Sequence, residues 1–344
     1  MKGDIGVRLL VTGGLGFIGS NFVRYSIKKN HRVVNLDMLT YAGNPENLGD
    51  IECSPAYRLI RGDIADTRLI EKTIGPDIDA VVNFAAESHV DRSISDPAPF
   101  IKTNVLGTQT LLKAVLKANL LNKSRQGSPI RFIQVSTDEV YGSLGTEGCF
   151  TEESPLSPNN PYSASKAAAD LLALSYHRTY GLPVIITRCS NNYGPYQYPE
   201  KLIPLAITNA LRDIPIPIYG DGLYTRDWVH VQDHCRAIEM VAASGAGDGE
   251  VFNIGGGNER TNIEIATGIL RILNKPLTLL RFVEDRSGHD RRYAVNYGKI
   301  LDRLGWRPEM PFSAGLEETV GWYVKNARWW EGLKNRERQY QALN

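Results

Sequence analysis

The stretch RLLVTGGLGFIGSNFVRYSI, residues 8–27, decides the fold of this chain. It opens with an apolar run typical of a buried strand, and a helix is expected after the glycines. Gly13, Gly16 and Gly19 satisfy the pattern G-x-x-G-x-x-G, and Gly14 with the last two satisfies G-x-G-x-x-G. Glycine is needed here because the turn is tight and a pyrophosphate must approach the backbone without a Cβ in the way. The helix N-terminus supplies free N–H groups to the phosphates.

Carboxylates follow the next two predicted strands. The strand Arg32–Asp37 ends in an acid, and the strand Tyr57–Gly62 is followed by Asp63. An acid at the second strand's tip accepts hydrogen bonds from the adenosine ribose and repels a 2′-phosphate, which favours NAD over NADP. Asp63 is expected to meet the adenine amino group. A tight turn without a ligand is the alternative reading of the glycines alone, and the two acids in register favour dinucleotide binding.

The first 190 residues alternate apolar runs with helical segments such as Asn104–Leu121 and Tyr162–Tyr180. Strands with apolar residues on both faces, separated by helices, indicate a parallel sheet covered on both sides. We therefore predict an α/β fold of the doubly wound Rossmann type, with residues 1–190 as the NAD-binding domain. The remaining predicted strands are Arg8–Thr12, Asp79–Ala85, Ile130–Ser136 and Pro183–Cys189.

After Asn191 turn signals crowd together and strands shorten, with helices expected over Val231–Ala243, Asn262–Leu273 and Phe312–Val324. Residues 191–344 are predicted to form a smaller, irregular substrate-binding lobe. The boundary is soft because the strand before it belongs to the sheet, so segments of the two parts are expected to interleave. Trp329 and the tryptophan after it are expected to serve packing or a subunit contact.

Composition excludes several classes of protein. The 344 residues carry 39 basic and 38 acidic side chains, so nothing resembles the basic surface of a nucleic-acid or membrane binder. The four cysteines lack zinc-ligand spacing and are expected to be free thiols, and no metal site is predicted. The N-terminus lacks a signal peptide's apolar core and no apolar run would span a bilayer, so the cytoplasm is expected.

Tyr162 and Lys166 are spaced i and i+4, which places them on one helix face. A nearby ammonium is expected to lower the pKa of the tyrosine toward neutrality. The resulting phenolate could take a proton from a sugar hydroxyl while hydride leaves the same carbon, and the lysine could hold the nicotinamide ribose. This spacing alone is common and usually structural. Here it follows a dinucleotide-binding half and the strand Ile130–Ser136.

The segment STDEVYG, residues 136–142, gives the closest resemblance. With the glycine loop and the Tyr-x-x-x-Lys pair, the chain resembles the extended short-chain dehydrogenases/reductases that act on nucleotide sugars. Epimerases of this kind usually lack the adjacent acids Asp138 and Glu139, which are typical of the 4,6-dehydratases. The resemblance runs from about Leu9 to Tyr323. It also includes AAESHVDRS at 85–93, NNYGPYQYPEKLIP at 191–204, YGDG at 219–222 and RDW at 226–228.

The resemblance implies a reaction on dTDP-glucose. Tyr162 would help to oxidise C4, and the ketone would acidify the proton at C5. Glu139 would then remove this proton, Asp138 would protonate the departing C6 hydroxyl, and hydride would return to C6. The product is a 4-keto-6-deoxy sugar of deoxysugar biosynthesis. The implied catalytic residues are Thr137, Asp138, Glu139, Tyr162 and Lys166, with Thr137 bonded to the C4 hydroxyl.

The resemblance also implies two binding sets and a homodimer built through a four-helix bundle of Asn104–Leu121 and Tyr162–Tyr180. Ser287 departs from the family's usual proline, which loosens the loop 285–289. The NAD-binding set is Gly13, Gly16, Phe17, Ile18, Gly19, Asp37, Thr40, Asp63, Ile64, Ala85, Ala86, Thr103, Tyr162, Lys166 and Asn192. The sugar-nucleotide set is Ser88, Thr137, Asn191, Lys201, Leu202, Pro217, Tyr219, Arg226, Asn262, Asp285, Arg286 and His289.

Other readings remain open at this point. A 4-epimerase or a UDP-glucuronate decarboxylase shares the fold, NAD and the Tyr/Lys pair but does not need the acid pair. A non-catalytic NAD-sensing module would not need Tyr162 and Lys166 together. Nothing physical in the sequence distinguishes thymine from uracil or cytosine, so a dehydratase of UDP- or CDP-sugars is also possible. Two adjacent acids can also be a solvated loop.

Overall fold

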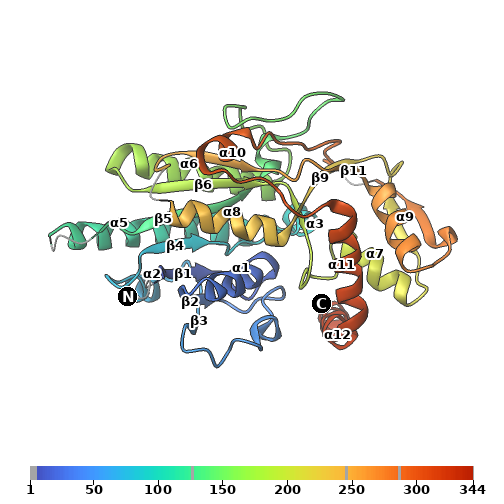
Figure 1. The fold of residues 1–344 in the computed structure, drawn as a ribbon, viewed down its shortest axis with the longest axis horizontal. Coiled ribbons are helices and arrows are strands. Elements are labelled where there is room, and N and C mark those ends of the chain that lie inside the picture. The colour runs from blue at the N-terminus through green and yellow to red at the C-terminus, as the bar shows by residue number, and fades with distance from the viewer. Residues whose placement is uncertain (1–5, 125–127, 245–246, 286–287, 344) are drawn as a thin grey trace.

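The computed structural model describes residues 6–124, 128–244, 247–285 and 288–343. Its centre is a seven-stranded sheet in the order β10-β6-β5-β4-β1-β2-β3, and every neighbouring pair in it is parallel (Figure 1). This confirms the predicted doubly wound α/β fold. The order reverses between β1 and β4, which opens a crevice at the carboxyl ends of these strands. The strands are β1 Arg8–Thr12, β2 Arg32–Asp37, β3 Tyr57–Arg61, β4 Ala80–Asn83, β5 Arg131–Thr137, β6 Val184–Cys189 and β10 Val251–Ile254.

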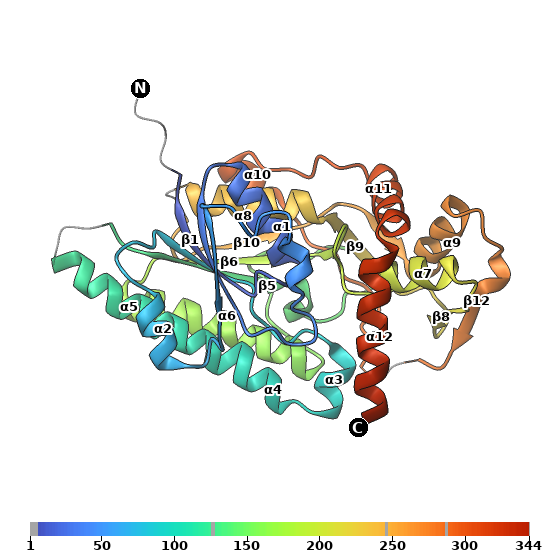
Figure 2. The same cartoon turned by 90° about the horizontal axis from the view of Figure 1, so that it is seen from below.

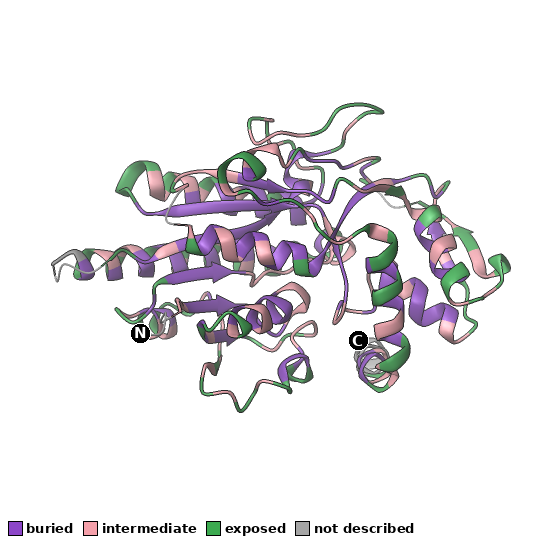
Figure 3. Ribbon diagram, in the orientation of Figure 1, coloured by how far each residue is buried: buried purple, intermediate pink, exposed green. Residues whose placement is uncertain are grey.

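Helices cover both faces of this sheet, and its central strands are buried (Figure 3), because their residues are apolar on both sides. One face packs against α1 (Phe17–Lys28), α8 (Val231–Ala243) and α10 (Gly298–Leu304). The other packs against α2 (Thr67–Thr73), α5 (Thr108–Ser124) and α6 (Pro161–Tyr180). The chain after residue 190 therefore returns to the large sheet, with α8, β10 and α10.

The rest of the second half builds a smaller lobe around its own apolar core, beside the sheet (Figure 2). One small sheet has the order β11-β9-β7, and β12 pairs with β8 in another. The strands are β7 Asn191–Tyr193, β8 Ile216–Tyr219, β9 Thr225–His230, β11 Glu259–Thr261 and β12 Leu280–Val283. The helices are α7 Leu202–Leu211, α9 Asn262–Ile272, α11 Phe312–Lys325 and α12 Ala327–Leu343.

Element ends differ from the sequence predictions at a few places. The first four residues of the helix predicted over Asn104–Leu121 belong to a π-helical turn, η2 (Ile101–Gly107), and α5 begins only at Thr108. Two short helices, α3 (Val90–Ser95) and α4 (Ala98–Phe100), precede this turn. Hydrophobic periodicity could not show this turn, because one extra residue in a turn shifts the period only locally. Short 3₁₀ turns, η1 (Pro45–Leu48), η3 (Asp138–Tyr141) and η4 (Leu277–Leu279), were not predicted either.

Three smaller findings complete the fold. Trp329 and Trp330 are buried in the core of the small lobe, which confirms their packing role. All four cysteines are free in the structure. Within the described ranges, every helix is too short or too polar to cross a membrane.

Candidate active site

The glycines of the loop between β1 and α1 have different tasks. A Cβ on Gly13, whose φ is +69°, would lie 2.7 Å from the backbone nitrogen of Ala85. A Cβ on Gly19 would lie 2.3 Å from the carbonyl oxygen of Gly13. A Cβ on Gly16 would come no closer than 3.3 Å to that same oxygen. Gly13 and Gly19 are therefore required by backbone packing, whereas Gly16 keeps the start of α1 accessible to a phosphate.

A cavity at the carboxyl ends of the parallel strands gathers most of the predicted site residues. It is lined by every residue of the predicted NAD-binding set, by the five predicted catalytic residues and by four of the predicted sugar-nucleotide contacts, Ser88, Thr137, Asn191 and Lys201. Asn191 contributes a buried Oδ1 without a hydrogen-bond partner among the described residues. The cavity's residues thus fit a dinucleotide and leave an acceptor for a further ligand.

Asp37 holds the glycine loop in place at the tip of β2. Its carboxylate accepts hydrogen bonds from the backbone N–H of Leu15 at 2.9 Å and of Leu39 at 2.8 Å. Burial raises the pKa of this carboxyl, and the two backbone donors partly oppose that rise. Asp37 is 6% exposed, so a second negative charge placed against its carboxylate would be poorly screened.

The π-helical turn η2 shapes the cavity wall that carries Thr103. The side chain of Asn104 in this turn donates to Ser165 Oγ at 2.8 Å and exchanges hydrogen bonds with the backbone of Glu87. It thus ties the loop after β4 to the helix that carries Tyr162. Next to it Lys102 pairs with Asp63 at 2.9 Å, so the predicted adenine contact has a cation that sequence reasoning missed.

The acid pair lies on a tight turn directly after β5. Thr137 caps the 3₁₀ helix η3, and its hydroxyl accepts a hydrogen bond from the backbone N–H of Glu139 at 3.3 Å. Asp138 is 1% exposed, and its Oδ2 has no hydrogen-bond partner among the described residues. The pair is therefore part of the cavity wall, and the alternative of a solvated loop is wrong.

The two acids lie in different electrostatic surroundings. Burial, then the negative charges of Glu139 and Asp227, raise the pKa of Asp138 well above its usual range. Burial also raises the pKa of Glu139, but the cations Lys201 and Arg226 oppose this rise. The surroundings therefore favour a protonated Asp138 beside a more readily ionised Glu139. A donor next to an acceptor is what paired acid–base chemistry requires.

Tyr162 lies in the first turn of α6, close to the acid pair. Asn160 and Ser163 form a capping box at the start of this helix, and Pro161 occupies its first position. Burial raises the pKa of Tyr162 well above 10, and the charges of Glu139, Cys189 and Asp138 add to the rise. The expected lowering of this pKa by Lys166 is thus wrong for this structure. The Lys166 ammonium instead donates to the carbonyl oxygen of Val135 at 2.6 Å, and burial lowers its own pKa.

Arg226, on β9, is not free to present its fork to a phosphate in this structure. Its guanidinium donates to the carbonyl oxygens of Asp290 at 2.8 Å and Thr225 at 2.8 Å, and it lies over the ring of Tyr293 at 4.4 Å. From this position it is a positive charge that acts on both Asp138 and Glu139.

The other predicted nucleotide contacts form a separate cluster in the small lobe. The ring of His289 stacks on Tyr224 at 3.7 Å, and its Nδ1 lies 2.8 Å from Oδ1 of Asp285. Tyr219, at the end of β8, meets His289 edge-on. The structure does not place these residues in the wall of the cavity, and the same holds for Leu202, Pro217 and Asn262. Arg286 and Ser287 lie outside the described residues.

Two further site residues were missed by sequence reasoning. The side chain of Asn160 hydrogen-bonds Glu139 and lowers its pKa. An asparagine before a proline that opens a helix is a recognisable cap signal, so this residue could have been found. Asp227 lies buried near Asp138 and accepts hydrogen bonds from Ser190 Oγ at 2.6 Å and the backbone N–H of Gly256 at 2.9 Å. It belongs to the RDW segment at 226–228, but nothing in that segment shows that Asp227 lies near Asp138.

Across the part of the chain that the structure describes, no group of three His, Cys, Asp or Glu side chains could hold a metal ion.

Asp138→Asn is expected to make the folded protein more stable at neutral pH. The folded-state pKa of Asp138 lies above its unfolded value of about 3.9, so the folded protein holds the proton of this acid more tightly than the unfolded chain does. The stability that this proton gives is present at low pH and is lost as pH rises through the folded pKa. The amide mimics the protonated acid and avoids this loss. Denaturant unfolding should show a gain on the order of 0.5–2 kcal/mol at pH 8 that shrinks toward pH 5. A gain that does not change with pH would contradict the assigned pKa shift.

A glycine loop, a Tyr/Lys pair and a carboxyl pair in one cavity define a dinucleotide-dependent enzyme of the extended short-chain dehydrogenase/reductase class. The sequence profile of the family described as GDP-mannose 4,6 dehydratase matches residues 10–319, and the chain belongs to this family. One relative, the dTDP-glucose 4,6-dehydratase of Xanthomonas campestris pv. campestris (strain B100), is 51% identical over 94% of this chain and 95% of its own length.

Solved structures agree with this assignment. The dTDP-glucose 4,6-dehydratase of Streptomyces venezuelae, with NAD and TYD bound, is 51% identical, with a TM-score of 0.90 over 95% of this chain and 100% of that one. The UDP-glucose 4-epimerase of Thermotoga maritima, with UDP-glucose, is 30% identical, with a TM-score of 0.84 over 93% of this chain and 100% of that one. The epimerase shares the fold at much lower identity.

Proposed function

We propose that this chain catalyses the NAD-dependent dehydration of dTDP-glucose to dTDP-4-keto-6-deoxyglucose, a hydro-lyase reaction of deoxysugar biosynthesis. The observation that carries the proposal is the buried pair Asp138–Glu139 in the same cavity as Tyr162 and the glycine loop. Relatives about half identical over nearly their whole length carry this activity in their names. A 4-epimerase needs only the Tyr/Lys pair, so its reaction would use neither of the two desolvated carboxyls.

The chemistry divides among five residues. Tyr162 takes the proton of the C4 hydroxyl, with Thr137 as a hydrogen-bond partner, and Lys166 would hold the nicotinamide ribose. Glu139 removes the proton at C5, and Asp138, whose pKa burial raises well above its usual range, gives its proton to the C6 hydroxyl as water leaves. NAD, when bound, supplies the hydride acceptor for C4 and the hydride for C6, and Glu139 returns a proton to C5 to complete the product.

The binding tasks follow the two parts of the chain. We assign residues 1–190 to NAD and residues 191–344 to the sugar nucleotide, with α8, β10 and α10 as the returning segments. Gly16 and Asp37 would hold the pyrophosphate and the adenosine ribose. Lys201, whose Nζ donates to the carbonyl oxygen of Ser88 at 3.2 Å, brings a cation from the second part to the cavity. The cytoplasm is the proposed compartment.

Product analysis with three nucleotide sugars tests the proposed substrate. dTDP-, UDP- and CDP-glucose are each incubated with the holoenzyme, and the products are separated and identified by mass. We expect dTDP-glucose to lose water at the highest kcat/KM. Faster dehydration of UDP- or CDP-glucose would move the assignment to a related dehydratase, and a product of unchanged mass would favour an epimerase.

Asp37 is expected to exclude NADP. The carboxylate is already committed to two backbone donors and is 6% exposed, so a 2′-phosphate would meet a like charge at a cost of several kcal/mol. We expect NADP to bind apoprotein at least about 100-fold more weakly than NAD, measured by calorimetric titration. Equal rescue of turnover by the two dinucleotides would show that Asp37 does not select the cofactor.

We also propose a homodimer through α5, α6 and the turn η2. These helices pack together and expose large apolar side chains, including Leu106, Leu171 and Tyr180. Leu171→Glu is expected to yield monomers at micromolar concentration in sedimentation analysis. Leu277→Glu, at a similarly exposed leucine of the small lobe, should leave the dimer intact. A dimer that resists the first change, or dissociates with both, would refute this interface.

A further inference from the structure

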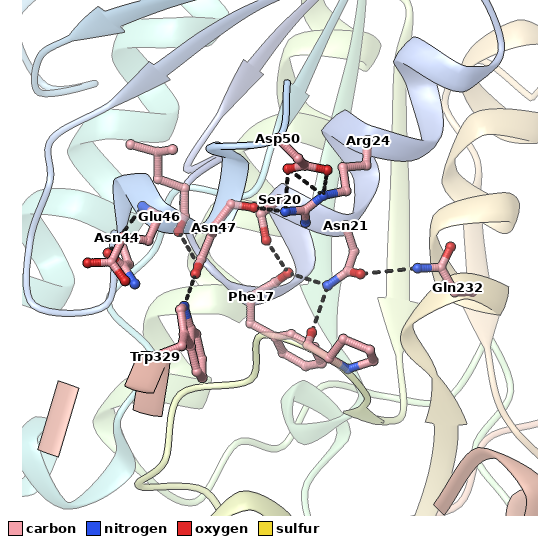
Figure 4. A network of polar contacts seen from close by, with 12 residues as sticks. Phe17, Ser20, Asn21, Arg24, Asn44, Glu46, Asn47, Asp50, Gln232 and Trp329 are labelled. Carbon is pink, nitrogen blue, oxygen red and sulfur yellow. Dashed lines mark hydrogen bonds and ion pairs between the residues drawn. The ribbon is translucent and has the colours of Figure 1, made fainter. Parts of the chain in front are cut away.

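The C-terminal helix reaches the dinucleotide-binding part through one tryptophan (Figure 4). The indole Nε1–H of Trp329 donates to Oδ1 of Asn47 at 2.8 Å, across 282 residues of sequence. Trp329 is 9% exposed and Asn47 is 2% exposed, so both partners of this bond are buried. Figure 2 shows α12 running along the boundary between the large sheet and the small lobe. This bond therefore joins two parts that have separate apolar cores.

On the side of the large sheet, Asn47 is hydrogen-bonded directly to the glycine loop. Its Nδ2 donates to the carbonyl oxygen of Leu15 at 2.8 Å, and Leu15 lies between Gly14 and Gly16. The backbone N–H of Leu15 in turn donates to Asp37. The amide oxygen of Asn47 thus accepts a hydrogen bond from the small lobe, and its amide nitrogen donates one to the loop that is proposed to hold the pyrophosphate.

On the side of the small lobe, Trp329 packs in a group of aromatic side chains, and one member of this group is hydrogen-bonded to the cavity wall. Tyr196 meets it edge-on at 5.8 Å, and Tyr323 lies 6.2 Å from it. The hydroxyl of Tyr323 donates to the carbonyl oxygen of Gln197, which lines the cavity. The guanidinium of Arg24 lies over the Tyr196 ring at 4.1 Å.

We propose that Trp329 is a positioning residue for the dinucleotide loop, acting through Asn47 to make NAD affinity depend on the packing of the small lobe. The inference rests on the proposed use of NAD by this loop. Loss of the indole N–H leaves the Asn47 oxygen buried without its donor, and the amide is then free to release Leu15. We expect Trp329→Phe to weaken NAD binding about tenfold, which corresponds to about 1.4 kcal/mol.

The neighbouring tryptophan is a matched control. Trp330 is 2% exposed, and its Nε1 donates to the carbonyl oxygen of Tyr323 at 2.9 Å, within the small lobe. Trp330→Phe should lower the thermal midpoint as Trp329→Phe does, but leave the Kd for NAD within about twofold of wild type. For Trp329→Phe, saturating NAD should restore kcat, because the reacting groups are untouched.

A second variant tests the other half of the contact. Asn47→Asp keeps an oxygen for Trp329 but removes the donor to the Leu15 carbonyl, so NAD binding should again weaken at least about tenfold. Asn47→Asp decides the question if Trp329→Phe does not fold. An unchanged Kd in both variants, or equal weakening in both tryptophan variants, would overturn the positioning role. Failure of wild-type apoprotein to bind NAD in the same titration would instead overturn the proposed function.

Discussion

Tyr162→Phe is expected to lower turnover of dTDP-glucose by a factor on the order of 10²–10⁴, the usual contribution of a general base. The ring stays in its pocket against Phe100, but the hydroxyl that takes the C4 proton is gone. Because C4 oxidation comes first, elimination and hydride return should fail with it. In single-turnover stopped flow, no reduced nicotinamide should appear.

A second tyrosine on the same helix gives the control. Tyr176 lies in α6 outside the cavity wall and packs edge-on against Tyr180. Tyr176→Phe should leave kcat within about twofold of wild type. Near-normal turnover by Tyr162→Phe would remove this residue from the mechanism. The wild-type pH–rate profile adds a check, because the raised pKa of Tyr162 predicts that oxidation speeds up as pH rises through the neutral range.

Glu139→Gln is expected to separate oxidation from elimination. Oxidation needs Tyr162, Lys166 and NAD, whereas loss of water also needs a base at C5. The amide keeps the size of the side chain and cannot accept that proton, so overall turnover should fall by about 10²–10⁴ while C4 oxidation continues. Reduced nicotinamide should therefore accumulate on the enzyme, seen as near-ultraviolet absorbance in stopped flow.

The matched control is Glu153→Gln, which changes an exposed carboxylate on the segment before α6. It should neither slow turnover nor accumulate reduced nicotinamide. If Glu139→Gln turned over normally, the carboxyl pair would have no part in elimination. If it failed to reduce bound NAD at all, Glu139 would be needed already for oxidation, and the division of labour proposed here would be wrong.

The sheet could be predicted from sequence because its central strands are buried on both faces. Arg8–Thr12 and Arg32–Asp37 are mainly apolar runs, the second interrupted by Asn35, and the structure reproduces both ranges. The π-helical turn η2 could not be predicted, because its signal is one added residue inside an ordinary helical period. The return of β10 to the sheet depends on pairing with β6, a contact between segments more than 60 residues apart.

The site was predictable where chemistry lies within one local segment. The glycine loop, Asp37 and the acid pair each carry their signal in a few adjacent residues. The pKa shifts of the site residues were not predictable, because they depend on burial and on charged partners from elsewhere in the chain. Spacing alone suggested that Lys166 would lower the pKa of Tyr162. In the structure the lysine donates to the Val135 carbonyl, and burial and the nearby carboxyls raise the pKa of the tyrosine.

The central claim is that one bound NAD moves a hydride from C4 to C6 while Asp138 and Glu139 remove water across C5–C6. It is tested most directly with dTDP-glucose that carries deuterium at C4, followed by mass and NMR analysis of the product. We predict that the deuterium reappears at C6, and that a solvent deuteron enters at C5 when the reaction runs in heavy water. Deuterium returned to C4, in a product that keeps its C6 hydroxyl, would contradict the account and identify an epimerase.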